Sequence, residues 1–526
     1  MTIEQWLEDA KSDAYRRKLP ELADMLDGLA RATAALRAAD WNEDAAGSAA
    51  PDTTTPTSST GRAPDAAPPA AGVARVEPLG STITALAPRI ACGEITSERI
   101  TEEALDVISK LNPRLNAFIT IVADEALMAA RTADKAIAAG RHLGPLHGVP
   151  ISLKDLIDLA GVPTTAASRL REGCIAAADA PVTTHLRHAG AVILGKTNLH
   201  EFAFGTTTED SGWGPARNPI DDTRSPGGSS GGSAIAVRSG MSIASIGTDT
   251  GGSIRIPAAA CGIVGLKPGW GEVDANGVVP LSRQLDHVGP LARSVDDAAL
   301  LFDILRGQPA QGVDERGDQS LSSVSFAVLE GYFFDRLSVD VDAGVRGAID
   351  TIARGGAGVC TASVPHALDI APIYLHLVLV DAAAYHARAL ERRPHAYTDG
   401  VRLRIEMGRS VAGEDYVRAL RGRTIIRDEI TRALKGVDAL LLPALSIEAP
   451  PLGAAAVPVM GGNEPVRTAM LRCTQPFNLS GHPAISLPCG MSRAGLPIGL
   501  QIVGHHGRTA DLLRTARIVE RALATR

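Results

Sequence analysis

The sequence lacks the features that mark nucleic-acid-binding and membrane proteins. Its 526 residues carry a formal net charge of only −7 at pH 7, so there is no basic field to attract a polyanion. The most apolar run, residues 371–384, is interrupted by His376 and Asp381 and is shorter than the roughly 20 residues that span a bilayer. Residues 1–13 are polar and acidic, unlike a signal peptide. We therefore expect a protein that binds neither nucleic acid nor a membrane.

Cysteine is also scarce. The chain has six cysteines, and none of them shows a C-x-x-C motif or the spacing of metal ligands. We interpret all six as reduced core residues and expect a cytoplasmic protein. The chain is long enough to bury a large core, since 45% of its residues are hydrophobic.

Composition divides the chain into three parts. Residues 1–45 contain an amphipathic helical pattern that begins at Pro20 and ends at Trp41, which predicts a small helical hairpin packed against the main body. Residues 46–78 are rich in Ala, Pro, Ser and Thr and cannot bury a core, so we predict a disordered linker. Residues 79–526 then form the main domain.

The main domain alternates short apolar segments with helical patterns. A periodic series begins at Ser81 and should stop at Asn112-Pro113. Further elements are predicted as helices over 123–139 and 183–190, and as strands around Lys154 and over 191–194, 325–329 and 439–442. This alternation is typical of an α/β fold in which helices cover the sheet.

Two Gly/Ser-rich loops stand at the centre of the chain. The first, residues 227–233, contains Ser229, and the second, residues 247–253, ends at Ser253. Glycine lets other groups approach the backbone closely and lets N–H groups turn inward. A hydroxyl among such N–H groups is placed to attack a carbonyl, with donors ready for the oxyanion.

Other interpretations of the loops fit less well. Gly/Ser tracts are usually flexible linkers, but periodic apolar segments flank the second loop directly. Neither loop has the lysine of a phosphate-binding G-x-x-x-x-G-K-[ST] motif or the spacing of a dinucleotide fingerprint. Residues 227–231 match the G-x-S-x-G nucleophile elbow, but that motif follows a strand, and residues 218–226 form a turn-rich stretch with two prolines.

The second loop has the better context for a nucleophile. A short buried strand is predicted over 242–247, and a helix follows Ser253 with Pro257 in its first turn. Backbone N–H groups at such a helix start have no partner within the helix. The loop therefore predicts an oxyanion hole with a serine at its edge.

Lys154 is the candidate base for that serine. It lies in an apolar, strand-like run, Val-Pro-Ile-Ser-Leu-Lys, whereas most lysines are solvated surface charges. Burial can lower a lysine pKa by up to roughly 3–5 units from about 10.4, which leaves a substantial neutral fraction near pH 7. A neutral amine can act as a general base, directly or through a bridging hydroxyl.

These residues resemble the amidase signature family, whose members use a Ser–cis-Ser–Lys triad. Ser253 matches the acylated nucleophile, Ser229 the bridging serine after a cis peptide, and Lys154 the base. The spacings of 75 and 24 residues between them agree with the family. Two further stretches, 195–203 and 478–486, extend the resemblance, which covers roughly residue 79 to the C-terminus.

The resemblance implies a fold and a mechanism. The fold would be α/β, a large, mixed, twisted sheet covered by helices on both faces. The backbone of Thr250, Gly251, Gly252 and Ser253 would form the oxyanion hole. Ser253 would form an acyl-enzyme with a small-molecule amide and release ammonia or an amine, with no metal and no organic cofactor. A homodimer is compatible with this interpretation.

Three further residues have alternative interpretations. His287 could be a catalytic histidine, but the family has a histidine there outside the triad, so we interpret it as structural. Arg472 could hold a substrate carboxylate or form an ordinary ion pair. The A-type subunits of tRNA amidotransferases carry a glutamine-binding aspartate at the position of Leu471, which counts against a glutaminase role.

Two other functions remain open at this point. One is that of the A-type subunit of an amidotransferase, which is a glutaminase that donates ammonia to a partner; residues 1–45 weakly resemble the small helical partner subunits of some such assemblies. The other is a Ser-His-Asp hydrolase with Ser229 as nucleophile. A scaffold without activity is disfavoured because every triad position is filled.

Overall fold

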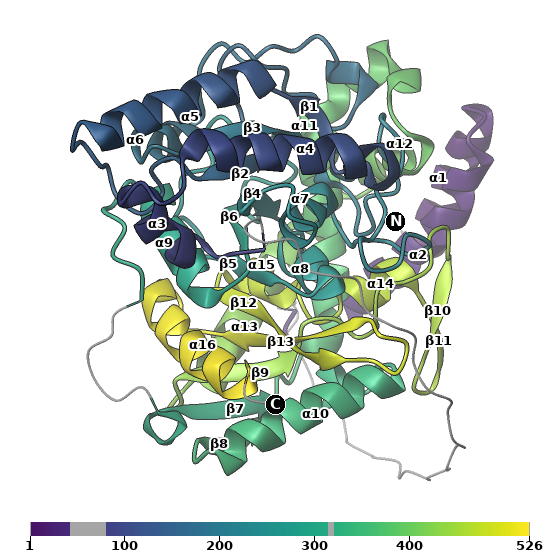
Figure 1. The fold of residues 1–526 in the computed structure, drawn as a ribbon. Coiled ribbons are helices and arrows are strands. Elements are labelled where there is room, and N and C mark those ends of the chain that lie inside the picture. The colour runs from purple at the N-terminus through teal and green to yellow at the C-terminus, as the bar shows by residue number, and fades with distance from the viewer. Residues whose placement is uncertain (1, 43–79, 314–319, 525–526) are drawn as a thin grey trace.

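The computed structural model describes residues 2–42, 80–313 and 320–524 (Figure 1). An eleven-stranded mixed sheet runs through the main domain, in the order β1-β3-β2-β4-β6-β5-β12-β13-β9-β7-β8. Its strands are β1 (Phe118–Ile121), β2 (Pro150–Lys154), β3 (Val192–Thr197), β4 (Ala244–Asp249), β5 (Val264–Lys267), β6 (His287–Ala292), β7 (Ser325–Leu329), β8 (Gly358–Ala362), β9 (Ala439–Pro443), β12 (Ala484–Met491) and β13 (Pro497–Val503). A separate hairpin consists of β10 (Ala456–Val459) and β11 (Gly462–Pro465).

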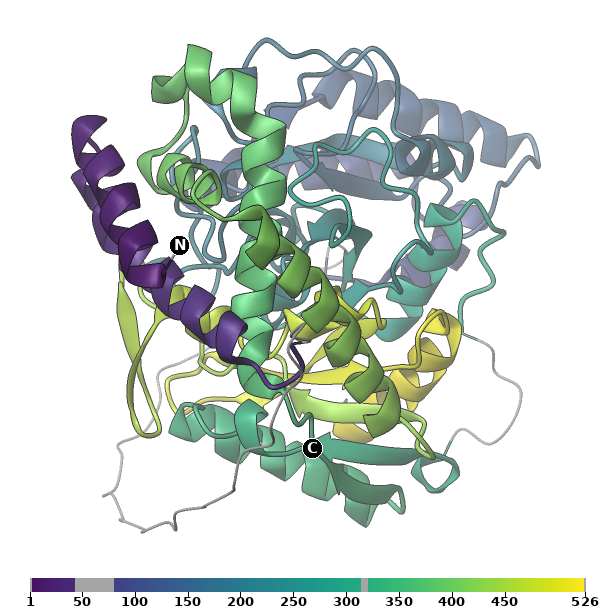
Figure 2. The same ribbon diagram turned by 180° about the vertical axis from the view of Figure 1, so that it is seen from behind.

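Helices cover both faces of the sheet, so the predicted α/β fold is confirmed. Figure 1 shows one face with α7, α8, α10 and α16, and Figure 2 shows α11 and α13 across the other. The helices are α1 (Ile3–Arg16), α2 (Pro20–Ala38), α3 (Ile83–Ala91), α4 (Ser97–Leu115), α5 (Ala123–Ala138), α6 (Pro181–His188), α7 (Gly231–Arg238), α8 (Arg255–Cys261), α9 (Val295–Leu305), α10 (Val339–Arg354), α11 (Ile370–Arg392), α12 (Asp399–Gly408), α13 (Gly413–Ala433), α14 (Val466–Leu471), α15 (Pro476–Ser480) and α16 (Thr509–Ala524).

Several details differ from the sequence-based expectations. Five strands of the main sheet besides β8 were not predicted, namely β1, β5, β6, β12 and β13. Helix α4 continues through Pro113 and ends at Leu115, where the left-handed backbone of Asn116 caps it. Pro113 has no N–H to donate to the Ser109 carbonyl, so the helix loses that hydrogen bond and continues for only two more residues. Strand β8 has no apolar pattern, since it is a largely exposed edge strand, and it was not predicted.

Strands β2, β3 and β4 set the position of Lys154 and of the second loop. Strand β2 lies between β3 and β4 and is parallel to both. The carboxyl ends of parallel strands meet at the same edge of a sheet, which is where α/β proteins place their ligands. Lys154 ends β2, and the second Gly/Ser loop follows β4 at that edge.

The N-terminal residues form the predicted helical hairpin. Helices α1 and α2 pack together, and α2 also contacts α11, α12 and α13 (Figure 2). The Trp6 indole donates to the Ser410 carbonyl at 2.8 Å, and Arg37 binds the Asp415 carboxylate through two hydrogen bonds of 2.8 and 2.7 Å. The predicted linker, 46–78, lies outside the described residues.

The apolar run at 371–384 is part of the longer helix α11. Residues 367–392 have the length and composition to cross a membrane, the one such helix among the described residues. More than half of its most apolar window is buried inside the fold, and α11 packs against α2, α12 and α13. Such packing is typical of the core helix of a large domain.

The expectation that all six cysteines lie in the core is wrong for three of them. None of the six, all of which lie in the described ranges, forms a disulfide. Cys261, Cys473 and Cys489 are buried, whereas Cys92, Cys174 and Cys360 are exposed. The scattered positions of the cysteines in the sequence indicated that they form no disulfides, but they did not indicate which side chains are buried.

The hairpin should contribute to the stability of the whole chain. Leu29 of α2 is completely buried in the main core, so Leu29→Ala should lower the free energy of unfolding by about 2–5 kcal/mol. Arg31→Ala, at an exposed position of the same helix, should change it by less than about 0.5 kcal/mol. Equilibrium denaturation measures both; equal effects of the two variants would show that the hairpin does not share the core.

Candidate active site

Lys154 lies completely buried at the end of β2. Its Nζ is 2.7 Å from Ser229 Oγ and 2.8 Å from Thr248 Oγ1, both hydrogen-bonding distances. Strand register brings these groups together, because β2 runs parallel to β4 with Leu153 opposite Ile246. The first two members of the proposed triad are thus in direct contact.

No carboxylate neutralises Lys154 among the described residues. The adjacent Asp155, in the turn that follows β2, instead pairs with Lys196 at 3.1 Å. Burial therefore lowers the pKa of Lys154 to about 7, against the opposing charges of Asp249 and Asp286. Near pH 7 a large fraction of the amine is neutral and can accept a proton.

The first loop holds Ser229 in a fixed position. The Gly228–Ser229 peptide is cis, as the family resemblance implies. A side chain on Gly228 would place its Cβ 2.8 Å from Thr208 Oγ1 and 2.9 Å from Thr207 N, so only glycine fits there. Ser229 is completely buried, and its neighbour Ser230 donates its N–H to the Ser253 carbonyl at 3.1 Å.

The second loop presents its backbone N–H groups outward. The Gly251 carbonyl accepts a hydrogen bond of 2.6 Å from the Thr474 hydroxyl. The N–H of the same planar peptide, on Gly252, therefore points the opposite way. Within the described part of the chain, none of the N–H groups of residues 250–253 donates to another protein group. They are free to bind an oxyanion.

The buried ion pair between Arg255 and Asp249 holds the two ends of this loop in place. Arg255 contacts Asp249 through Nε at 3.1 Å and Nη2 at 2.8 Å. Burial alone would raise the pKa of Asp249, but the adjacent Arg255 charge holds it far below its usual range. Asp249 also accepts the Ile254 N–H at 3.1 Å, at the start of α8. The same carboxylate thus anchors both the end of β4 and the beginning of the next helix.

Ser253 lies at the edge of the site rather than inside it. Its side chain is 6% exposed, whereas Lys154 and Ser229 are fully enclosed. Its hydroxyl and that of Ser229 make no direct hydrogen bond with each other in the structure, although their loops are joined through the Ser230 N–H. Catalytic hydrogen bonds are often long in free enzymes and tighten when substrate binds.

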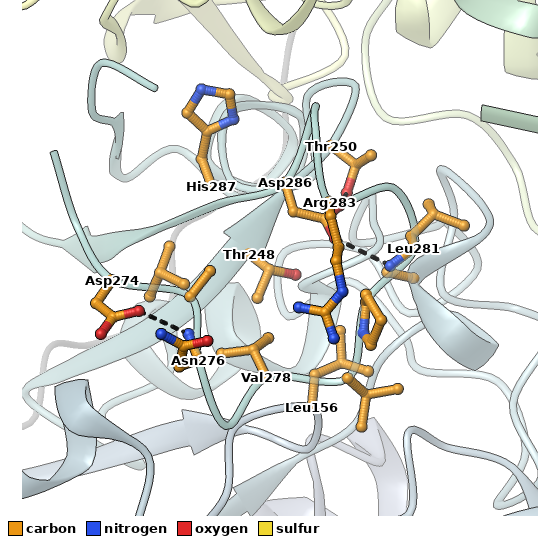
Figure 3. Close-up of a pocket in the computed structure, with 15 residues that line it drawn as sticks. Leu156, Thr248, Thr250, Asp274, Asn276, Val278, Leu281, Arg283, Asp286 and His287 are labelled. Atoms are coloured by element: carbon orange, nitrogen blue, oxygen red, sulfur yellow. Dashed lines mark hydrogen bonds between the residues drawn. The ribbon is translucent and has the colours of Figure 1, made fainter. Parts of the chain in front are cut away.

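A cavity opens beside the second loop (Figure 3). Thr248, Thr250 and Asp286 line it, and the exposed Arg283 extends across it. The Thr250 hydroxyl donates to Asp286 at 2.6 Å, and burial raises the pKa of Asp286 to about 6. The contact positions Thr250, whose N–H belongs to the proposed oxyanion hole.

The structure assigns His287 and Arg472 to structural contacts. The His287 ring is buried, with Nδ1 2.7 Å from the Leu285 carbonyl, and Figure 3 shows it on the opposite side from Leu156 and Arg283. Burial lowers its pKa well below the usual value, so the ring is neutral. Arg472 forms an ion pair with Glu464 at 2.7 Å, which is the alternative expected for it.

The nucleophile-elbow interpretation of Ser229 fails on its context. Residues 218–226 contain no strand, and Ser229 contacts a lysine rather than a histidine. Sequence reasoning missed Thr248 and Asp286 as supports of the site. Thr248 lies within the second loop and Asp286 directly precedes His287, but nothing in the sequence specified their contacts.

Comparison with known proteins agrees with this geometry. The family model described as Amidase matches residues 99–513. The A-type subunit of a glutamyl-tRNA(Gln) amidotransferase of Chloroflexus aurantiacus is 37% identical over 474 residues, covering 84% of this chain and 96% of the relative. A crystal structure of an amidase is 37% identical with a TM-score of 0.79, covering 84% of this chain and 99% of the other. A 6-aminohexanoate cyclic dimer hydrolase solved with its substrate is 32% identical with a TM-score of 0.74, covering 85% and 98%.

The pKa of Lys154 makes the reactivity of the site depend on pH. A fluorophosphonate should label the protein faster as the pH rises through about 7, because the neutral amine, which activates the serine, is populated above that pKa. Lys154→Met should label slowly at every pH. A wild-type rate that rises only above about pH 9 would mean that the amine is solvated and charged.

Proposed function

Because the chain belongs to the amidase signature family and is a hydrolase of amide carbon–nitrogen bonds, we propose that it cleaves a small linear amide through an acyl-enzyme on Ser253. The observation that carries this proposal is the 2.7 Å contact between Lys154 Nζ and Ser229 Oγ in a fully buried setting. A lysine held in this way serves as a base toward a hydroxyl.

The proton moves along two hydroxyls. Neutral Lys154 takes a proton from Ser229, which takes one from Ser253 as the latter attacks the amide carbonyl. The N–H groups of residues 250–253 bind the oxyanion, and each such donor is worth about 10²–10³ in rate. The relay then returns the proton to the departing amine or ammonia, and water hydrolyses the acyl-enzyme by the same path.

The alternative function is that of an ammonia-donating component of an amidotransferase. Its support is the identity of 37% to the Chloroflexus protein, which equals the identity to the crystallised amidase. Leu471 argues against it. This apolar side chain faces the oxyanion loop, 3.1 Å from the position of a Cβ on Gly251, where the glutamine-binding proteins are expected to have an aspartate. We therefore favour an enzyme that acts without a partner.

A screen of amides with ammonia detection tests the reaction. The purified chain alone should hydrolyse members of the panel, and Lys154→Ala, Ser229→Ala and Ser253→Ala should each lose at least about 10³-fold in kcat/KM. Ser239→Ala, beyond the end of α7, should retain activity. Ammonia release that requires an added partner protein would favour the amidotransferase alternative.

Peptide mapping tests the assignment of the nucleophile. After fluorophosphonate treatment, the modified peptide should carry the label on Ser253, which is the less completely buried serine of the pair. Label on Ser229 with Ser253 unmodified would contradict the mechanism and would favour a hydrolase that uses the first loop.

A further inference from the structure

Arg467 is an arginine without an acidic partner close to the second Gly/Ser loop. It lies half-buried on α14, and no carboxylate among the described residues pairs with it. Its neighbours differ in this respect: Arg472 binds Glu464 at 2.7 Å, and Arg404 donates to the Phe204 carbonyl at 2.8 Å and lies 3.6 Å from Asp210. A guanidinium that is partly withdrawn from water and has no acidic partner is stabilised by an anion that neutralises it.

Arg467 lies on the helix face that borders the second Gly/Ser loop. It lies four residues before Leu471, so the two share a face of α14, about 6 Å apart along the axis. Leu471 contacts the oxyanion loop at Gly251. The Arg467 guanidinium carbon is 5.6 Å from the centre of the Phe204 ring, and Phe204 follows the 3₁₀ turn Glu201–Ala203.

Tyr374 borders the same loop. A side chain on Gly251 would collide with the Tyr374 hydroxyl, so the phenol borders the oxyanion hole directly. Burial raises the pKa of Tyr374, and the positive charge of Arg467 opposes that rise. Leu471, on the helix face that it shares with Arg467, and Tyr374 thus both border the proposed oxyanion hole.

The local charge balance favours an anion at this place. Arg467 and Arg404 both contact Phe204, through its ring and its carbonyl respectively, and the pKa of Arg404 is lowered by burial first and by the charge of Arg467 second. The carboxylate beside them, Asp210, is already in contact with His200 at 3.2 Å. An added carboxylate would relieve the repulsion between the two arginines and could bind a guanidinium through two parallel hydrogen bonds.

We propose that Arg467 binds a carboxylate of the substrate, so that the enzyme selects amides that carry an acidic group a few bonds from the scissile carbonyl. The proposal rests on the amidase function proposed above. Phe204 and Leu471 contribute apolar surface against which the carbon chain between the two groups packs. Arg467 acts on binding and takes no part in the proton relay.

Matched substrates test this selection. Malonamate, succinamate and glutaramate are each compared with a neutral amide of equal length, in wild type and in Arg467→Met. The wild type should prefer the acidic member, and Arg467→Met should lose about 10²-fold in kcat/KM on it, mainly through KM, with little change on the neutral member. Arg467→Lys should recover part of the preference, and Arg354→Met, an exposed arginine on α10, should behave as wild type.

A second measurement separates this proposal from the proposed function. Succinate or glutarate should protect Ser253 of the wild type from fluorophosphonate labelling, and the protection should be lost in Arg467→Met while labelling without dicarboxylate stays fast. Labelling at the normal rate with no protection in the wild type, or an equal loss on acidic and neutral amides, would overturn the role of Arg467. Absence of any labelling of Ser253 would instead contradict the amidase mechanism.

Discussion

A lysine enclosed without a negative partner determines what the rest of this structure can do. Lys154 is out of contact with water, and its amine touches the hydroxyls of Ser229 and Thr248. Removing an ammonium from water costs several kcal/mol, and no ion pair within the described residues repays that cost. The neutral amine is therefore populated near pH 7, and only that form can accept a proton from a serine.

The fold maintains this condition through two features of the sheet. Strand β2 ends at Lys154, and Asp155, in the turn that follows, pairs with Lys196 instead. The parallel pairing of β2 with β4 then places the amine beside the loops that hold the two serines. The Asp249–Arg255 pair and the Thr474 hydroxyl fix the backbone of the second loop, so its N–H groups are oriented before substrate arrives.

The sequence was informative wherever a local pattern of residues is compatible with only one local structure. The apolar setting of Lys154, the glycines of the two loops and the helix start after Ser253 predicted burial, close approach and free N–H groups, and the structure contains each of these features. The α/β class followed from the alternation of strands and helices. The edge strand β8 could not be predicted, because its exposed residues carry no hydrophobic periodicity.

Contacts between segments that are distant in the chain could not be predicted from the sequence. The sequence offered Arg472 as a substrate ligand, but the folded chain pairs it with Glu464 and leaves Arg467, five residues earlier, beside Phe204. Likewise, Asp286 supports Thr250 across 36 residues. Charge pairing is a property of tertiary structure, so the choice among candidate arginines had to wait for it.

The protonation of one amine is the point on which this account rests. Lysine-selective NMR of the Ser253→Ala protein, with Lys154→Met to assign the signal, would follow the Lys154 Nζ resonance as the pH is raised. The account predicts a midpoint near pH 7. A midpoint near the ordinary lysine value of about 10.4 would contradict it, because the amine would then be cationic at neutral pH and unable to take the proton from Ser229.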